Sequence, residues 1–162
     1  MLIRDLMDAD LPALLAIHND VVTNTTAIYD QRTATFDERA AYFAGRVQKG
    51  YPVLVGEVGG EVVGYSTFGE WRSRWGYRHT VEHSVHVRSD SRGKGYGGLL
   101  IEALFPRATA LGMHVMIGHI DSAAKASLRL HEKLGFKTIG TFREVGRMHD
   151  RWLDVVAVQR EV

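Results

Sequence analysis

One carboxylate stands close in the chain to a basic, glycine-rich loop. Glu82 lies within T-V-E-H-S-V-H-V, which alternates polar and apolar residues as a half-buried β-strand does. The loop that follows carries glycine at positions 93, 95, 97 and 98, interleaved with Arg92 and Lys94. Glycines let the backbone approach a ligand closely, and the free N–H groups that open the next helix favour an anion. We therefore predict a pyrophosphate site beside a candidate general base.

The spacing of this loop disfavours a triphosphate loop, a dinucleotide loop and a purely structural turn. A nucleoside-triphosphate loop requires G-K-[ST], but the lysine here is followed by Gly95. A dinucleotide fingerprint is formally present as Gly93, Gly95 and Gly98, yet the first glycine lies several residues beyond the strand end at Val87. The preceding strand also alternates, unlike the continuous apolar run of a buried parallel strand. A structural turn would not need so many glycines, because each costs conformational entropy on folding.

The elements that must position these residues alternate between strands and helices. Strands are predicted at Leu2–Arg4, 53–58, 61–68, from Val81 to Val87, 115–120, Lys137–Val145 and Trp152–Arg160. Helices are predicted from an Asp8 or Asp10 cap to about Val22, at Glu38–Lys49 after an Asp37 cap, at Leu99–Leu111, and from residue 122 to a stop at Gly135. This order favours a layered α/β (α+β) domain with a mixed sheet and helices on its faces.

Composition narrows the class of protein. The 162 residues suit one domain spanning 1–162, and a net charge of +1 gives no indication of nucleic acid or a membrane surface as partner. The absence of cysteine excludes disulfides, thiolate metal ligands and a cysteine nucleophile. His79 and His83 fall on a loop and a strand, so their spacing carries no ligand geometry and we expect no metal. No secretion signal or membrane-length apolar run is apparent, and we expect a cytoplasmic protein.

Two motifs together resemble a known family. The pattern Arg92-x-x-Gly95-x-Gly97, entered from a strand, resembles the pyrophosphate loop of the GNAT acyltransferase superfamily, where it holds coenzyme A. The stretch S-L-R-L-H-E-K-L-G-F, Ser127 to Phe136, is similar to that family's closing helix and strand. With T-V-E-H-S-V-H-V the combination resembles the phosphinothricin and methionine sulfoximine N-acetyltransferase group. The resemblance covers nearly the whole chain and implies a mostly antiparallel GNAT sheet, acetyl-CoA as co-substrate and a homodimer.

The resemblance also implies roles for individual residues. Glu82 would be the general base that deprotonates the amine; the alternative is a solvated carboxylate on a strand. The residues expected to hold the cofactor are Val85, His86, Val87, Arg92, Gly93, Lys94, Gly95, Tyr96, Gly97, Gly98 and Ser127. His131 stands where many GNAT enzymes have a tyrosine that protonates the thiolate, and a proton donor, a positioning group and a core histidine all stay open. Relatives usually carry asparagine where this chain has Ala124, so one cofactor hydrogen bond is expected to be missing.

The segment G-E-W-R-S-R-W-G-Y-R-H-T, residues 69–80, is the candidate acceptor pocket. Arginine can bind a carboxylate bidentately and aromatic rings can wall a side-chain slot, although a subunit contact would use the same residue types. The residues expected to bind the acceptor are Arg72, Arg74, Trp75, Gly76, Tyr77 and, from an opposite wall, Tyr29.

The resulting functional prediction is an acetyl-CoA-dependent N-acetyltransferase. Its acceptor would be the α-amino group of a small amino-acid analogue such as methionine sulfoximine, methionine sulfone or phosphinothricin. The amine would attack directly, because no cysteine is available for an acyl-enzyme. The alternatives are another amine, such as a polyamine, an aminoglycoside or a peptide N-terminus, and a non-catalytic acyl-CoA sensor.

Overall fold

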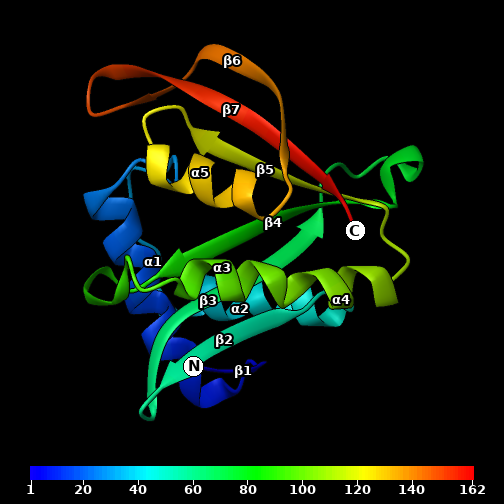
Figure 1. The fold of residues 1–162 in the computed structure, drawn as a ribbon. Helices are drawn as coiled ribbons and strands as arrows, with labels where there is room; N and C mark the ends of the chain where they lie inside the picture. Colours follow the sequence, from blue (N-terminus) through cyan, green and yellow to red (C-terminus); the bar gives the residue numbers. More distant parts are fainter.

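Seven strands form one sheet, in the order β1-β2-β3-β4-β5-β7-β6, in the computed structural model, which describes residues 1–162 (Figure 1). The strands are β1 (Leu2–Asp5), β2 (Val53–Val58), β3 (Glu61–Glu70), β4 (Thr80–Val87), β5 (Val115–Asp121), β6 (Lys137–Met148) and β7 (Arg151–Glu161). All neighbours pair antiparallel except β4 and β5, which run parallel. The predicted mixed, mostly antiparallel α/β fold is confirmed.

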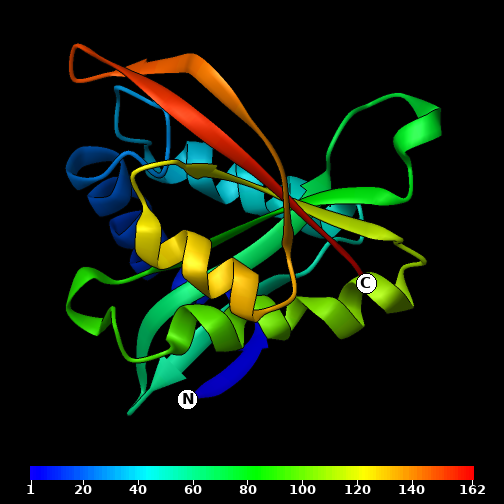
Figure 2. The same ribbon diagram turned by 45° about the horizontal axis from the view of Figure 1, so that its top comes forward.

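Helices cover both faces of this sheet (Figures 1 and 2). They are α1 (Leu11–Asn24), α2 (Phe36–Gln48), α3 (Tyr96–Glu102), α4 (Leu104–Ala110) and α5 (Lys125–Lys133), with 3₁₀ turns at Asp8–Asp10, Trp75–Tyr77 and Ser89–Ser91. Successive residues of a strand point to opposite faces. Val53 and Val55 of β2 accordingly join a core with Leu14 of α1, whereas Leu54 between them joins a core with Ile101 of α3.

Three predicted helix starts are wrong. Helix α5 starts at Lys125 rather than at residue 122, and the other two starts have a local cause. Thr35, rather than Asp37, caps α2: its hydroxyl accepts from the N–H of Glu38, whose carboxylate accepts in return from the N–H of Thr35. This reciprocal capping box starts the helix at Phe36. The helix expected at Leu99–Leu111 starts earlier, at Tyr96, and divides at 103 into α3 and α4.

The division between α3 and α4 has a cause in the sequence. Residue 106 is a proline, which has no N–H to donate to the carbonyl of Glu102 four residues earlier. The helical hydrogen-bond ladder is therefore interrupted, and Ala103 serves as the C-terminal cap of α3 and the N-terminal cap of α4. The two short helices together cover the length of the single predicted helix.

The parallel pair in the middle of the sheet is short. β4 and β5 pair only at Thr80 with Val115, Val81 with Met116 and Glu82 with Ile117. Beyond Glu82, β4 remains paired with β3 on its other side, while β5 continues to Asp121 beside β7. The two strands therefore diverge after Glu82, and the opening between them positions the site.

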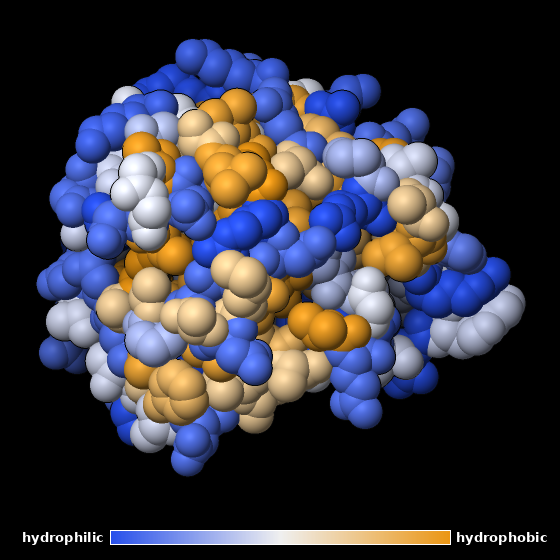
Figure 3. Space-filling view, turned by 90° about the horizontal axis from the view of Figure 1, so that it is seen from below, coloured by the Kyte–Doolittle hydropathy of each residue, from blue (hydrophilic) through white to orange (hydrophobic).

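The molecular surface mixes apolar and charged groups. In the face seen from below in Figure 3, hydrophobic side chains gather toward the middle and hydrophilic ones lie around the rim. Exposed apolar residues occur in β1 and the turn after it, including Leu2 and Met7. None of the helices combines the length and the apolar character needed to cross a bilayer.

Candidate active site

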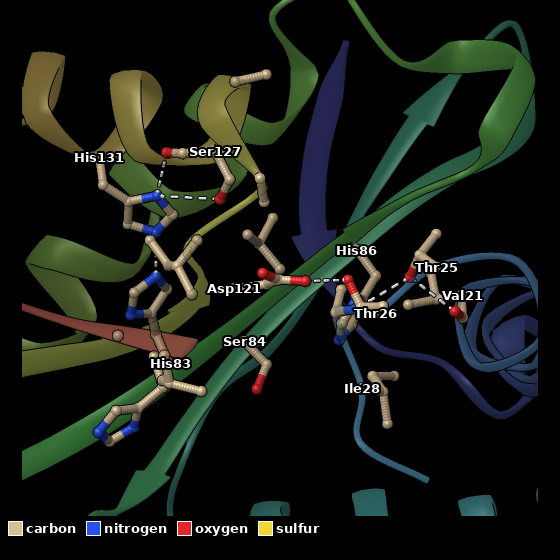
Figure 4. A pocket seen from close by; sticks show the side chains of 18 of the residues that line it. Val21, Thr25, Thr26, Ile28, His83, Ser84, His86, Asp121, Ser127 and His131 are labelled. Atoms are coloured by element: carbon tan, nitrogen blue, oxygen red, sulfur yellow. Dashed lines mark hydrogen bonds between the residues drawn. The ribbon is translucent and has the colours of Figure 1, made fainter. Parts of the chain in front are cut away.

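A cavity of about 590 Å³ lies where β4 and β5 diverge (Figure 4). Four parts of the chain line it. They are the end of α1 with the loop 25–29, residues 82–87 of β4 with Arg92, residues 118–121 of β5 with Val155 of β7, and the start of α5 with Ala124, Ala126, Ser127 and His131. The opening left by the short parallel pair therefore becomes a cleft whose walls come from distant parts of the sequence.

Glu82, the candidate base, lies at the start of this opening and is held by a histidine. Its Oε1 is 2.8 Å from Nδ1 of His119 on β5, and the two side chains are 38% and 31% exposed. Both line the cavity. Sequence reasoning missed His119, because only the β4–β5 register, with Glu82 opposite Ile117, brings residue 119 near the carboxylate.

His131, the second catalytic candidate, meets another histidine that sequence reasoning did not assign to the site. Nε2 of His131 on α5 lies 2.9 Å from Nε2 of His83 on β4, and the residues are only 3% and 7% exposed. Both line the cavity and pack against Phe136. Burial lowers the pKa of His131 and lowers that of His83 to about 4. One feature of the sequence could have indicated His83. It directly follows Glu82 on an alternating strand, so its side chain points to the opposite face of β4.

The unpaired edge of β4 continues the cavity wall toward the glycine loop. Val85, His86 and Val87 all line the cavity. The ring of His86 lies 5.3 Å, between centroids, from that of Tyr65, and burial with nearby cations lowers the pKa of His86 to about 3. His86 is therefore neutral at pH 7. Because no strand pairs with this edge of β4, backbone groups there are free to pair with an extended ligand.

The glycine loop supplies backbone donors and one anchored cation. Gly93 and Gly95 have φ angles of 77° and 83°, values that only glycine adopts readily. The N–H groups of Gly93, Lys94 and Gly95 donate to no other backbone group. Arg92 lines the cavity and is held by the carbonyl of Val87 at 3.0 Å and by a carboxylate oxygen of Asp20 at 3.2 Å. The arrangement suits a phosphate ligand.

Helices α3 and α5 meet over this loop. A Cβ on Gly98 would lie 3.2 Å from Leu130 of α5, so glycine here permits close helix packing. Gly97 has ordinary clearance from the same leucine, and Tyr96 begins α3. Ser127 lines the cavity, as does Ala124 at the position where a side-chain donor is expected to be missing. The cofactor candidates thus surround one end of the cavity, whether as lining residues or in the adjoining loop.

The opposite wall is tied across the cavity mouth. The hydroxyl of Thr26 donates to Asp121, whose other oxygen accepts from the N–H of Ala123. Tyr29 also lines the cavity, and burial together with the carboxylates of Asp121 and Asp154 raises its pKa. The loop 25–29 is therefore fixed to the end of β5 and forms the side facing Glu82.

The Trp–Arg segment lies elsewhere in the single chain. Of the predicted acceptor residues, Tyr29 lines the cavity, but Arg72, Arg74, Trp75, Gly76 and Tyr77 do not. The segment projects at the right of Figures 1 and 2, and Trp75 is 77% exposed. Trp71 packs edge-on against Tyr77, and Arg78 covers Trp75. One protomer therefore does not bring these side chains to its own cavity.

No three His, Asp or Glu side chains come together as a group able to hold a metal ion. The polar groups of the cavity are instead paired with one another, as Glu82 is with His119. The site therefore offers a carboxylate, a buried histidine pair and backbone donors as its chemical groups.

These features belong to a recognised class of enzyme. The acetyltransferase (GNAT) family model matches residues 14–136, so the chain belongs to this family and is an N-acetyltransferase. A relative named L-methionine sulfoximine/L-methionine sulfone acetyltransferase, from Pseudomonas paraeruginosa, is 49% identical over 97% of this chain and 92% of its own length. The family assignment and the narrower group predicted from the sequence are confirmed.

Two solved structures share the fold throughout. A ribosomal-protein-alanine N-acetyltransferase from Brucella melitensis is 42% identical with a TM-score of 0.98, covering 100% of both chains. A phosphinothricin acetyltransferase from Sinorhizobium meliloti, solved in complex with AcCoA, is 36% identical with a TM-score of 0.96, covering 99% of this chain and 88% of that one. The names of these relatives include both small amino-acid analogues and ribosomal-protein alanine.

Proposed function

We propose that this protein transfers an acetyl group from acetyl-CoA to the α-amino group of a small amino-acid analogue of the methionine sulfoximine, methionine sulfone or phosphinothricin type. One observation carries the proposal: Glu82 of β4 and His131 of α5 line the same cavity, beside the unpaired edge of β4. The 49% identity to a methionine sulfoximine/sulfone acetyltransferase supports the acceptor class. The proposal takes residues 1–162 as one GNAT domain.

Glu82 is the general base of the proposed reaction. An amine reaches the enzyme mainly as ammonium, which has no lone pair to attack with. Glu82 takes one proton from it, and His119 keeps the carboxylate oriented toward the cavity at 2.8 Å. The freed nitrogen then attacks the acetyl carbonyl directly, because the chain has no cysteine for an acyl-enzyme.

His131 is the general acid of the proposed reaction. When the bond between the acetyl carbon and the sulfur breaks, the coenzyme A thiolate takes up a proton. His131 is the titratable residue of α5 that lines the cavity. Proton removal and proton delivery therefore fall to side chains on two different elements, β4 and α5.

Acetyl-CoA binding is proposed for the groups at the other end of the cavity. The free N–H groups of the loop, with Arg92 and Lys94, would hold the pyrophosphate, and Gly98 lets α3 pack closely behind it. The β4 edge at Val85–Val87 would pair with the pantetheine arm, and Ser127 adds a hydroxyl from α5. The hydrogen-bond donors at this end of the cavity match the anionic pyrophosphate and the amide groups of the pantetheine arm of coenzyme A.

The acceptor would lie against Tyr29 and Thr26 beside Asp121, a carboxylate that suits the incoming ammonium. We further propose a homodimer whose subunit contact includes the Trp–Arg segment, because Trp75 and the aromatic side chains of Phe142 and Trp152 are exposed in one protomer. From that contact Arg72 and Arg74 can serve an acceptor carboxylate. Light scattering should return twice the 18.1 kDa chain mass; a monomer would remove this part of the proposal.

The acceptor is tested by a thiol-release assay with acetyl-CoA. Methionine sulfoximine, methionine sulfone and phosphinothricin should each give turnover, whereas polyamines and aminoglycosides should give none. A peptide bearing an N-terminal alanine tests the second candidate, which the 42% identity to a ribosomal-protein-alanine N-acetyltransferase favours. Turnover confined to that peptide would replace the small-molecule acceptor. Acetyl-CoA binding with no turnover on any amine would indicate a sensor.

Detoxification follows from the chemistry. Acetylation removes the positive charge of the α-ammonium, so the product no longer matches sites that bind the free amino acid. We propose that this occurs in the cytoplasm, where acetyl-CoA is made and used. Cells expressing the protein should tolerate methionine sulfoximine better than cells expressing an inactive variant, and cell fractionation should recover it in the cytoplasmic fraction.

A further inference from the structure

Two histidine rings meet edge to edge inside the cavity wall. His83 of β4 and His131 of α5 approach through their Nε2 atoms at 2.9 Å, and both residues are almost fully buried (Figure 4). Their surroundings keep water away: Phe136 packs against both rings, with centroids 5.2 and 5.1 Å away. Gly118 makes room for His83, since a Cβ there would lie 2.7 Å from its Cε1. The contact is thus built into the packing of three elements.

The other nitrogen of each ring faces a carbonyl oxygen. Nδ1 of His83 lies 2.8 Å from the oxygen of Ile117, and Nδ1 of His131 lies 2.7 Å from the oxygen of Ser127. A carbonyl oxygen can only accept, so each Nδ1 must carry a proton to make its hydrogen bond. A neutral imidazole has a single N–H. With both rings neutral, two bare Nε2 lone pairs would therefore face each other at hydrogen-bonding distance.

Two rearrangements would keep both rings neutral, but the distances disfavour both. If His83 carried its proton on Nε2, its bare Nδ1 would face the Ile117 carbonyl at 2.8 Å. His131 could carry its proton on Nε2 and accept at Nδ1 from the hydroxyl of Ser127. That hydroxyl is 3.5 Å from Nδ1, at the outer limit of a hydrogen bond, whereas the carbonyl of the same residue is at 2.7 Å. The Nδ1 lone pair would then face that carbonyl oxygen. A proton held between the two Nε2 atoms satisfies all three short contacts.

Burial opposes even the first added proton, because it lowers the pKa of each ring. The geometry favours one proton nevertheless, since each Nδ1 faces a carbonyl oxygen and the two Nε2 atoms face each other. A second added proton would place two positive charges 2.9 Å apart. The titratable neighbour on β4 is His86, which is neutral at pH 7; β5 brings the Ile117 carbonyl and Gly118; α5 brings Ser127. No carboxylate is hydrogen-bonded to either ring, so the pair differs from Glu82 with its histidine partner.

We propose that His83 and His131 hold one proton in common and that His83 is the positioning residue that keeps His131 charged as the proton donor to the thiolate. This inference rests on the acetyl transfer proposed above. As the carbon–sulfur bond breaks, the Ser127 hydroxyl moves closer to Nδ1 of His131 than its 3.5 Å in the structure. It gives its own proton to the coenzyme A sulfur and takes the Nδ1 proton in return. The shared proton then passes fully to Nε2 of His131. The pair is left neutral, coenzyme A leaves as the thiol, and the pair regains its proton from solvent.

Nitrogen-15 NMR of histidine-labelled protein tests the shared proton without any acceptor. At pH 7 both Nδ1 atoms of the pair should show N–H shifts, and both Nε2 atoms should share one strongly downfield proton. His79, whose Nδ1 also lies 2.8 Å from a carbonyl but meets no second histidine, serves as the ordinary ring in the same spectrum. A His131 ring with a bare Nδ1 and an ordinary Nε2–H would overturn the inference. Since no turnover is needed, this result is independent of the proposed acceptor.

The variant His83→Gln tests the role in catalysis. Glutamine can still donate to Ile117 and accept from Nε2 of His131, but it cannot share a charge, so the downfield signal should disappear. We expect kcat to fall roughly 10-fold with little change in KM for acetyl-CoA. The high-pH limb of the kcat profile should move to lower pH, because His131 alone holds its proton less firmly. The control His79→Gln should leave the kcat profile and the KM for acetyl-CoA unchanged. An unchanged kcat profile in a folded His83→Gln variant would reject the role.

Discussion

Neighbouring residues of β4 place two histidine contacts in opposite environments. Glu82 and His119 form a pair that is about one-third exposed, while His83 and His131 form one that is nearly fully buried. The first can exchange protons with solvent at once, whereas Phe136 packs against both rings of the second and leaves them little contact with water. The alternation of β4 thus places Glu82, with its exposed partner, and His83, with its buried partner, on opposite faces of one strand. All four residues line the same cavity, where β4 and β5 diverge.

The largest effect is expected from removing the base. Glu82→Gln should lower kcat by about 100-fold or more, because an ammonium cannot attack until it loses a proton. KM for acetyl-CoA should change little, and steady-state thiol release measures both. Glu102→Gln changes an exposed carboxylate of α3 outside the cavity and should be neutral. Full activity of Glu82→Gln at saturating acetyl-CoA would reject Glu82 as the base.

Removing the proposed proton donor should lower kcat less than removing the base does. His131→Phe is expected to lower kcat by about 10-fold, since a thiol of pKa near 8.5 is a tolerable leaving group even without a proton donor. The deficit should shrink as the pH falls and solvent supplies the proton. His114→Phe, at an exposed position on the loop before β5, is the matched control. A loss as large as that of Glu82→Gln would show that the two sides do not differ as proposed.

Removing His119, the hydrogen-bond partner of Glu82, should lower kcat by a still smaller factor. His119→Leu removes the 2.8 Å hydrogen bond to Glu82, and about 1 kcal/mol of orientation corresponds to about a 5-fold loss in kcat. His114→Leu provides the control. The double variant with Glu82→Gln should be no slower than Glu82→Gln alone, because His119 acts through that carboxylate. Additive losses would instead give His119 a separate role.

The smallest expected effect concerns stability at the cavity mouth. Thr26→Val keeps the branched shape but removes the hydroxyl that donates to buried Asp121. Loss of that hydrogen bond should lower the free energy of unfolding by about 1 kcal/mol and Tm by about 2–4 °C. Thermal denaturation measures this, with the exposed Thr23→Val as control. Equal Tm values for the two variants would show that the contact across the mouth adds nothing.

Local patterns predicted the parts of the site that depend on local geometry. The strand alternation around Glu82, the positive-φ glycines at 93 and 95 and the helix carrying Ser127 and His131 are all properties of short stretches. They were sufficient for the fold class and the family, which are confirmed. The remaining site assignments stay predictions until residues are tested.

The features that sequence reasoning missed depend on long-range register. His83 and His119 gain their meaning only from where β5 lies beside β4, and the end of that pairing after Glu82 leaves no mark in either strand. The Trp–Arg segment illustrates the opposite difficulty, since its composition suited a pocket although it projects from the single chain. Composition alone does not tell whether such residues line a pocket or form a contact surface.

The divergence of β4 and β5 also bears on how this enzyme can change. Three residue pairs and the lengths of two strands create the opening, so it is a property of the backbone rather than of any one side chain. The part proposed to bind the acyl donor is built from residues 82–98 and the start of α5, whereas the wall proposed for the acceptor comes from the loop 25–29 and the end of β5. Under that proposal, mutation can vary the amine that is accepted while the acyl donor stays the same. Directed evolution toward new amines should therefore begin at residues 25–29.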